Sequence, residues 1–203
     1  MGKRRNQREL IQSLSQRELY ANLYFTQIIF LALTVILSFI FKQDVSAWLD
    51  LVSFDLNSIL LWAIPTILIV VVIDVILWKK APGKWMDDGG INERIFATIS
   101  FPHLLFVSCM IGISEELLFR GILQVNLGYV PASILFAFMH IRYVYKPVLL
   151  LFVTLLSFLL GGIFLLTQNL LIPIVVHIFI DFILGLIIRY NVFSVRAKSN
   201  FQE

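Results

Sequence analysis

The sequence predicts an all-α membrane protein: a polytopic helical bundle of about six transmembrane helices with both termini in the cytoplasm. Of its 203 residues, 59% are hydrophobic and only 14% are charged, and the mean hydropathy is +0.89. This composition lies outside the usual balance of soluble domains and is typical of membrane proteins. Because the length allows about six spans and little else, we expect one membrane domain over residues 1–203.

The distribution of positive charge predicts the orientation. With the spans given below, all but two of the 16 Lys and Arg residues fall on one side of the membrane. The exceptions are Lys42, after the first span, and Arg120, inside the third. Because cytoplasmic loops carry an excess of Lys and Arg, we expect a multi-pass protein of the cell membrane with both termini in the cytoplasm.

The N-terminal part should hold a basic arm, two spans and an amphipathic loop. Residues 1–19 are rich in Lys and Arg, which suits an anionic lipid surface, and beside a membrane span we favour lipid over nucleic acid as their partner. Residues 20–101 then hold apolar runs at about 20–41 and 56–78. A polar stretch with Gly and Pro follows at 79–101 and predicts a loop with a short surface helix.

The remaining four spans are expected within residues 102–190. Ser100-Phe-Pro102 has the pattern of a helix start, because proline is tolerated in the first turn. The fourth span is short for a full crossing, and residues 128–131 are expected to form the turn before it. The predicted spans are 102–127, 132–145, 147–167 and 170–190.

Three charged groups stand inside the third span. An ionised side chain near the bilayer centre costs at least about 2.5–3.5 kcal/mol, so such residues are rare without a use. Glu116 and Arg120 are four residues apart on one helix face, in the favourable order for an ion pair. Glu115 is turned about 100° around the axis and lies about 19 Å along the span. We therefore expect Glu116 to be neutralised by Arg120, with Glu115 free to face another helix.

Two histidines occur in patterned settings in other spans. Phe136 precedes His140 by one helical turn, and His177 precedes Asp181 by the same interval. Glu115, His140 and His177 should lie at comparable depths, within about 10–18 Å of the side opposite the termini. The third, fourth and sixth spans would then converge on one polar pocket in the membrane.

Such a pocket suits hydrolysis in one of two ways. A buried glutamate can take and return a proton near neutral pH, with one imidazole holding the same water and another donating to an oxyanion. Alternatively, Glu115, His140 and His177 could bind zinc and leave a position open for water. The cofactor is thus Zn²⁺ or none. Covalent catalysis ranks low, because Ser114 has no evident base and Cys109 is nearly two turns from Glu115.

Three motifs in order resemble the CAAX protease and bacteriocin-processing (CPBP, or Abi) family of intramembrane proteases. They are Glu-Glu-x-x-x-Arg at 115–120, Phe-x-x-x-His at 136–140 and His-x-x-x-Asp at 177–181. The resemblance covers residues 102–190, which would form the catalytic core. It implies a glutamate-dependent endopeptidase that cleaves a peptide bond within or at the membrane.

The resemblance also implies residue roles. Glu115 would be the catalytic base, His140 would position the water, and His177 with Asp181 would stabilise the oxyanion. Glu116, Arg120 and Phe136 would support them. One departure matters, because the last motif position is often Asn in prenyl-protein proteases and a carboxylate has no amide to donate. Asp181 would have to be protonated, orient His177 or bind a metal.

The leading functional hypothesis is a membrane protease that trims a small peptide or the C-terminal tail of a lipidated protein, in peptide or bacteriocin maturation or self-immunity. The alternative is a non-catalytic regulator or immunity protein that binds a partner membrane protein. A cation or proton transporter is weakened by the absence of an evident inverted repeat. The sequence makes no prediction about oligomeric state.

Overall fold

The structure, a computed structural model, describes residues 13–86 and 88–192. It is a helical bundle, and these two ranges contain no strand. By length and composition, four helical runs could cross a membrane, as expected for a multi-pass protein. They are α2 (Gln16–Phe41), the continuous run Leu56–Lys80, α11 (Pro147–Thr167) and α12 (Leu171–Arg189).

The other helices complete the bundle. The run from residue 56 to 80 consists of α4 (Leu56–Ser58), the π-helix η1 (Ile59–Ala63) and α5 (Ile64–Lys80). A second continuous run consists of α8 (Phe101–Glu116), the π-helix η2 (Leu117–Gln124) and α9 (Val125–Leu127). The shorter helices are α3 (Val45–Asp50), α6 (Gly83–Met86), α7 (Ile91–Phe96), α10 (Tyr129–Met139) and η3 (Ile141–Tyr143).

The start of the third predicted span is confirmed. Ser100 is the N-cap of α8, its side chain accepts a hydrogen bond from the backbone N–H of His103, and Pro102 stands in the first turn. This is how a serine cap and a proline begin a helix. The turn predicted at 128–131 is shorter than expected, because α10 already begins at Tyr129. Only Gly128, with φ of 94°, separates α9 from α10.

The predicted extent of the fourth span is wrong at its end. We expected helix to Tyr145, but α10 ends at Met139, and His140 is its C-cap with φ of −94°. Eleven residues of α-helix rise only about 16 Å, so α10 is about half as long as the ~30 Å apolar core of a bilayer.

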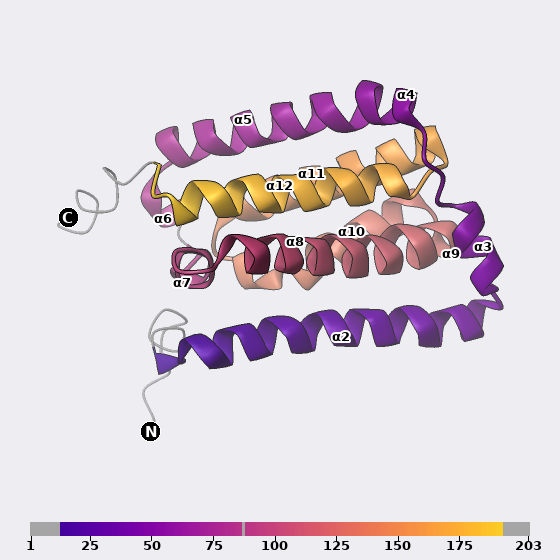
Figure 1. Cartoon of the computed structure of the whole chain (residues 1–203), viewed down its shortest axis with the longest axis horizontal. Helices are drawn as coiled ribbons and strands as arrows, with labels where there is room; N and C mark the ends of the chain where they lie inside the picture. Colours follow the sequence, from indigo (N-terminus) through magenta and orange to yellow (C-terminus); the bar gives the residue numbers. More distant parts are fainter. Residues whose placement is uncertain (1–12, 87, 193–203) are drawn as a thin grey trace.

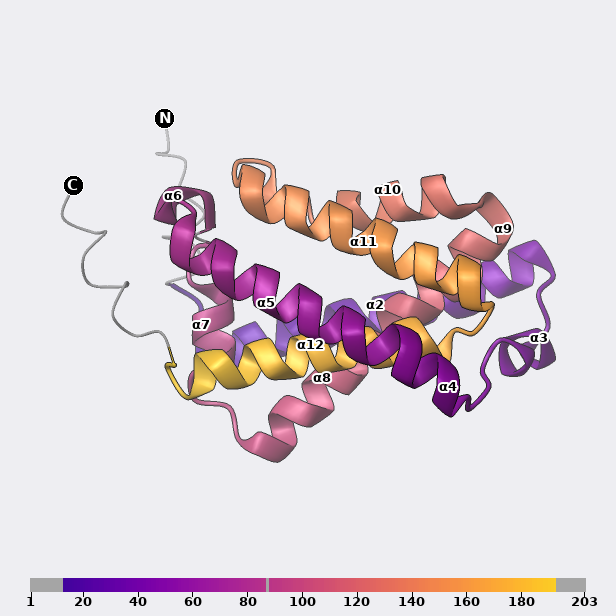
Figure 2. The same ribbon diagram turned by 90° about the horizontal axis from the view of Figure 1, so that it is seen from above.

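Helices α8 and α12 lie at the centre of the bundle (Figure 1). α2 packs along α8, α5 and α11 pack on α12, and α10 packs on α11 and η2. Figures 1 and 2 place the start of α2 and the end of α12 at the same end of the bundle, with α6 and α7. This agrees with the prediction that both termini share one side. The basic arm predicted at 1–19 lies mostly outside the described residues.

Close contact between α8 and α12 depends on one glycine in each helix. A Cβ built on Gly112 would lie 2.7 Å from Cγ1 and 3.1 Å from the backbone nitrogen of Ile178. A Cβ on Gly185 would lie 2.5 Å from Cδ1 of Leu104. Small residues let membrane helices approach closely. Gly112 is one turn before Glu115, so the packing also determines how near that carboxylate comes to α12.

We expect Gly112→Ala to lower the unfolding temperature in detergent micelles, because the added Cβ would force α8 away from α12. This loss should appear although alanine favours helix over glycine by about 1 kcal/mol. Gly162→Ala in α11 is the matched control, because a Cβ there meets nothing nearer than the Tyr129 hydroxyl at 3.5 Å. Equal melting temperatures for the two variants would contradict the close packing.

Candidate active site

A π-helix begins directly after the two adjacent glutamates. α8 ends at Glu116, and η2 runs from Leu117 to Gln124 with Arg120 inside it. π-helical turns are rare and often occur at functional sites, because they widen the helix and re-aim side chains. Sequence periodicity did not reveal this segment, since an α-helix and a π-helix share the same apolar composition.

The predicted polar site residues, Glu115, Glu116, Arg120, His140, His177 and Asp181, form what we call the buried cluster. The Glu116 carboxylate lies at its centre. Its Oε1 atom accepts a hydrogen bond from Nη1 of Arg120 at 3.0 Å and lies 2.7 Å from Nδ1 of His177. The side chains of Glu116 and Arg120 are 0% and 1% exposed. The predicted Glu116–Arg120 pair is thus confirmed. The contact with His177 was not predicted, because helical spacing relates residues of one helix and not those of two.

Arg120 joins three helices through its guanidinium group. Its Nη2 atom donates to the backbone oxygen of Ser157 in α11 at 2.9 Å and to the Ser157 hydroxyl at 3.3 Å. The guanidinium carbon lies 4.6 Å from the centre of the Phe136 ring in α10, a cation–π contact. Sequence reasoning missed Ser157, although a lone serine within the apolar run of the fifth span was a usable signal.

Glu115 faces a different part of the cluster. It is 6% exposed, and its side chain has no hydrogen bond to another described residue. Its charge interacts with those of His177 and Asp181 on α12. The two adjacent carboxylates therefore differ: Glu116 is fixed by a cation, whereas Glu115 is buried without such a contact.

His177 and Asp181 form the α12 side of the cluster. Nε2 of His177 lies 3.7 Å from Oδ2 of Asp181, which is an electrostatic contact rather than a direct hydrogen bond. The Asp181 side chain is 28% exposed, against 7% for His177. The α12 side of the cluster is therefore more open at Asp181 than at His177, while the Glu116 end of the cluster is closed.

His140 reaches the cluster from beyond the end of α10. Its ring stacks on that of Phe136, with centroids 5.0 Å apart and an angle of 27°, and Nδ1 lies 3.0 Å from the Phe136 backbone oxygen. Phe136 stands between the two histidines, with its ring centre 6.2 Å from that of His177. The predicted proximity of all three helices is therefore observed.

The side chains do not form a metal-ligand set as they lie here. Within residues 13–86 and 88–192, no group of three or more His, Cys, Asp and Glu side chains could hold a metal ion. Nδ1 of His177 is occupied by Glu116, and Nδ1 of His140 by a backbone oxygen. These contacts leave Nε2 of each ring for a metal, so the zinc hypothesis would require the side chains of Glu115, His140 and His177 to move into a common ligand set.

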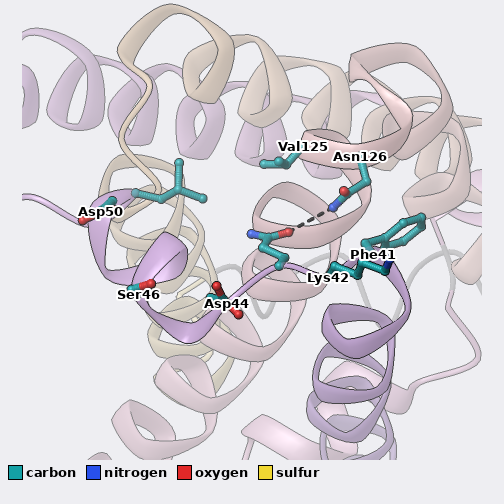
Figure 3. A pocket seen from close by; sticks show the side chains of 9 residues that line it. Phe41, Lys42, Asp44, Ser46, Asp50, Val125 and Asn126 are labelled. Carbon is teal, nitrogen blue, oxygen red and sulfur yellow. Dashed lines mark hydrogen bonds between the residues drawn. The ribbon is translucent and has the colours of Figure 1, made fainter.

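A separate pocket of about 440 Å³ lies where α2, α3 and α9 meet (Figure 3). Its wall includes Gln43, which donates to the Gly121 backbone oxygen and accepts from the amide of Asn126, both at 3.0 Å. None of the seven predicted site residues lines this pocket. The predicted site residues therefore lie apart from this pocket, whose own titratable lining residues are Lys42, Asp44 and Asp50.

We expect Arg120→Ala to destabilise the fold by about 3–5 kcal/mol, because it leaves the buried Glu116 carboxylate without its cation. The measurement is thermal or denaturant unfolding in detergent. The double variant Glu116→Gln with Arg120→Met removes both charges and should recover much of that stability. If Arg120→Ala unfolds like the wild type, the ion pair does not stabilise the bundle.

Comparison with known proteins identifies the family. The protein-family model described as Type II CAAX prenyl endopeptidase Rce1-like matches residues 97–183, a range that contains the whole cluster. The uncharacterized protein YpbD of Bacillus subtilis (strain 168) is 36% identical over 166 residues, which cover 82% of this chain and 88% of YpbD. No solved structure matches the chain. The chain therefore belongs to the Rce1-like family of type II CAAX prenyl endopeptidases, within the CPBP group that its three motifs resemble.

Proposed function

We propose that this multi-pass membrane protein is an intramembrane endopeptidase in which Glu115 activates the attacking water. Family membership supports protease activity in general. The observation that carries the specific assignment is the difference between the two adjacent glutamates. Glu116 is held by Arg120 and His177, whereas Glu115 is buried, makes no hydrogen bond to a described residue and lies within electrostatic range of His177 and Asp181.

In the proposed reaction, Glu115 takes a proton from water while the oxygen attacks the carbonyl carbon of the scissile peptide bond. The carbonyl oxygen becomes an oxyanion, and Nε2–H of His177 donates to it. Glu115 then gives the proton to the leaving nitrogen as the carbon–nitrogen bond breaks, which releases an amine and a carboxylic acid. His140 directs its Nε2 atom at the attacking water.

Glu116 prepares His177 for this role. Because Nδ1 faces the Glu116 carboxylate at 2.7 Å, that nitrogen carries a proton and the ring is held in one orientation. Nε2 then points towards Asp181, 3.7 Å away. In our proposal Asp181 favours a proton on Nε2 of His177, so a protonated imidazole meets the oxyanion. This assigns Asp181 an orienting role and does not require an amide at position 181.

We propose a small peptide or the C-terminal tail of a lipidated protein as substrate, reached from the membrane. Asp181 is the more exposed member of the α12 pair, Glu115, Glu116 and Arg120 are almost fully buried, and His140 is partly exposed. Only an extended chain can bring its backbone carbonyl to such a site. Peptide or bacteriocin maturation and self-immunity are the processes that would use this cleavage.

We expect Glu115→Gln to abolish proteolysis while the protein still inserts and folds, because glutamine keeps the shape but cannot accept the proton. The variant should retain uncleaved peptides on purification from membranes. Mass spectrometry identifies these peptides, and wild-type protein in liposomes should cleave them.

Glu93→Gln is the matched control, since Glu93 lies exposed on α7 outside the cluster, and it should remain fully active. If Glu115→Gln keeps wild-type biological function, the proposed protease is wrong, and the non-catalytic regulator becomes the better explanation.

We also propose that the reaction proceeds without a metal. Cleavage of the captured peptides should survive dialysis against a chelator, because in this proposal the carboxylate alone activates water. Elemental analysis of the purified protein gives an independent measurement. Chelator-sensitive cleavage that zinc restores, together with stoichiometric zinc that His140 or His177 variants lose, would refute the metal-free mechanism.

A further inference from the structure

We infer that Tyr143 is a positioning residue for His140, a role that rests on the proposed function of His140 in proteolysis. The two rings stack, with centroids 6.2 Å apart and an angle of 26°. No motif contains Tyr143, and it lies beyond the observed end of α10 at Met139. The stacking offers His140 a second support in addition to Phe136.

His140 needs such a support because it stands at a helix end. Its backbone has left the α-conformation, and its ring contacts α10 through the hydrogen bond and the stacking with Phe136. The hydrogen bond of Nδ1 with the Phe136 backbone oxygen fixes one ring atom. Rotation about that contact would still move Nε2, the nitrogen proposed to act on water. A ring on the imidazole face opposes this rotation.

The local backbone explains why residue 143 supplies that ring. The backbone N–H of Tyr143 donates to the oxygen of His140 at 2.9 Å, and a 3₁₀ helix covers Ile141–Tyr143. In a 3₁₀ helix the side chains at i and i+3 lie one above the other. The sequence Met139-His-Ile-Arg-Tyr143 therefore places a nearly parallel, offset tyrosine ring beside the histidine as soon as the α-helix ends.

Tyr143 is itself held firmly. It is 6% exposed, its hydroxyl accepts a hydrogen bond from Nη2 of Arg142 at 2.5 Å, and the Arg142 guanidinium lies 4.6 Å from its ring centre. The hydroxyl also lies near Asn92 and the charge of Asp88, which belong to the segment around the start of α7. A buried ring with these contacts can restrain its neighbour.

The first test measures the position of His140 without any substrate. The chain has three histidines, so selective labelling gives a simple NMR spectrum in nanodiscs, with His103 and His177 as internal references. Tyr143→Leu should shift and broaden the His140 ring signals, because the ring current and the restraint are both lost. Tyr143→Phe keeps the ring and should leave the linewidth unchanged. Tyr145→Leu is the matched control, since Tyr145 is 86% exposed.

The second test uses the peptides captured by Glu115→Gln. Misplacing a catalytic group by about 1 Å costs about 100-fold in rate, so Tyr143→Leu should lower kcat by about 10- to 100-fold with KM little changed. Tyr143→Phe and Tyr145→Leu should stay within about twofold of wild type. A wild-type melting temperature for Tyr143→Leu separates loss of the ring from loss of the fold.

The outcomes separate the two proposals. Unchanged His140 signals in Tyr143→Leu, or equal loss of kcat in Tyr143→Leu and Tyr143→Phe, would overturn the positioning role. Altered His140 signals, together with wild-type protein that cleaves none of the captured peptides, would support the contact and refute the proteolytic function.

Discussion

The carboxylate of Glu116, sealed among helices and shared by Arg120 and His177, is the interaction on which the cluster depends. An isolated charge inside lipid is costly, and losing one partner of a buried pair costs more than the pair contributes. Here the pair is also connected to α11 through the hydrogen bonds of Arg120 to Ser157. The charged groups therefore restrict how α8, α11 and α12 can be arranged relative to one another.

The same interaction gives the adjacent residues Glu115 and Glu116 different roles. If Glu116 and Glu115 both lacked partners, their like charges would compete for protons. Because the positive charge of Arg120 compensates the negative charge of Glu116, Glu115 can exchange a proton without repulsion from an uncompensated carboxylate beside it. The glycines at 112 and 185 matter for the same reason, since they bring α12 close enough for His177 to reach Glu116.

Much of the bundle could be predicted from the sequence. Apolar runs, a serine cap before Pro102 and four-residue spacings identify helices and the Glu116–Arg120 pair, because these depend on local chemistry. The contacts of Glu116 with His177 and of Arg120 with Ser157 join different helices, so no periodicity reveals them. The early end of α10 at Met139 was missed because the apolar composition continues through Ile141, and composition alone does not show where an α-helix tightens into a 3₁₀ turn.

The shortness of α10 also has a consequence for the lipid around it. A bilayer meets a hydrophobic segment shorter than its own core by thinning locally. With α10 rising about 16 Å, acyl chains on this flank should be compressed near the segment that follows Met139. With such thinning, we expect headgroups and bulk water to lie nearer to His140 than to the middle of the flanks formed by α2 and α5. A hydrolase within a membrane needs water as its second reactant. The thinned bilayer beside α10 would supply that water without a channel through the bundle.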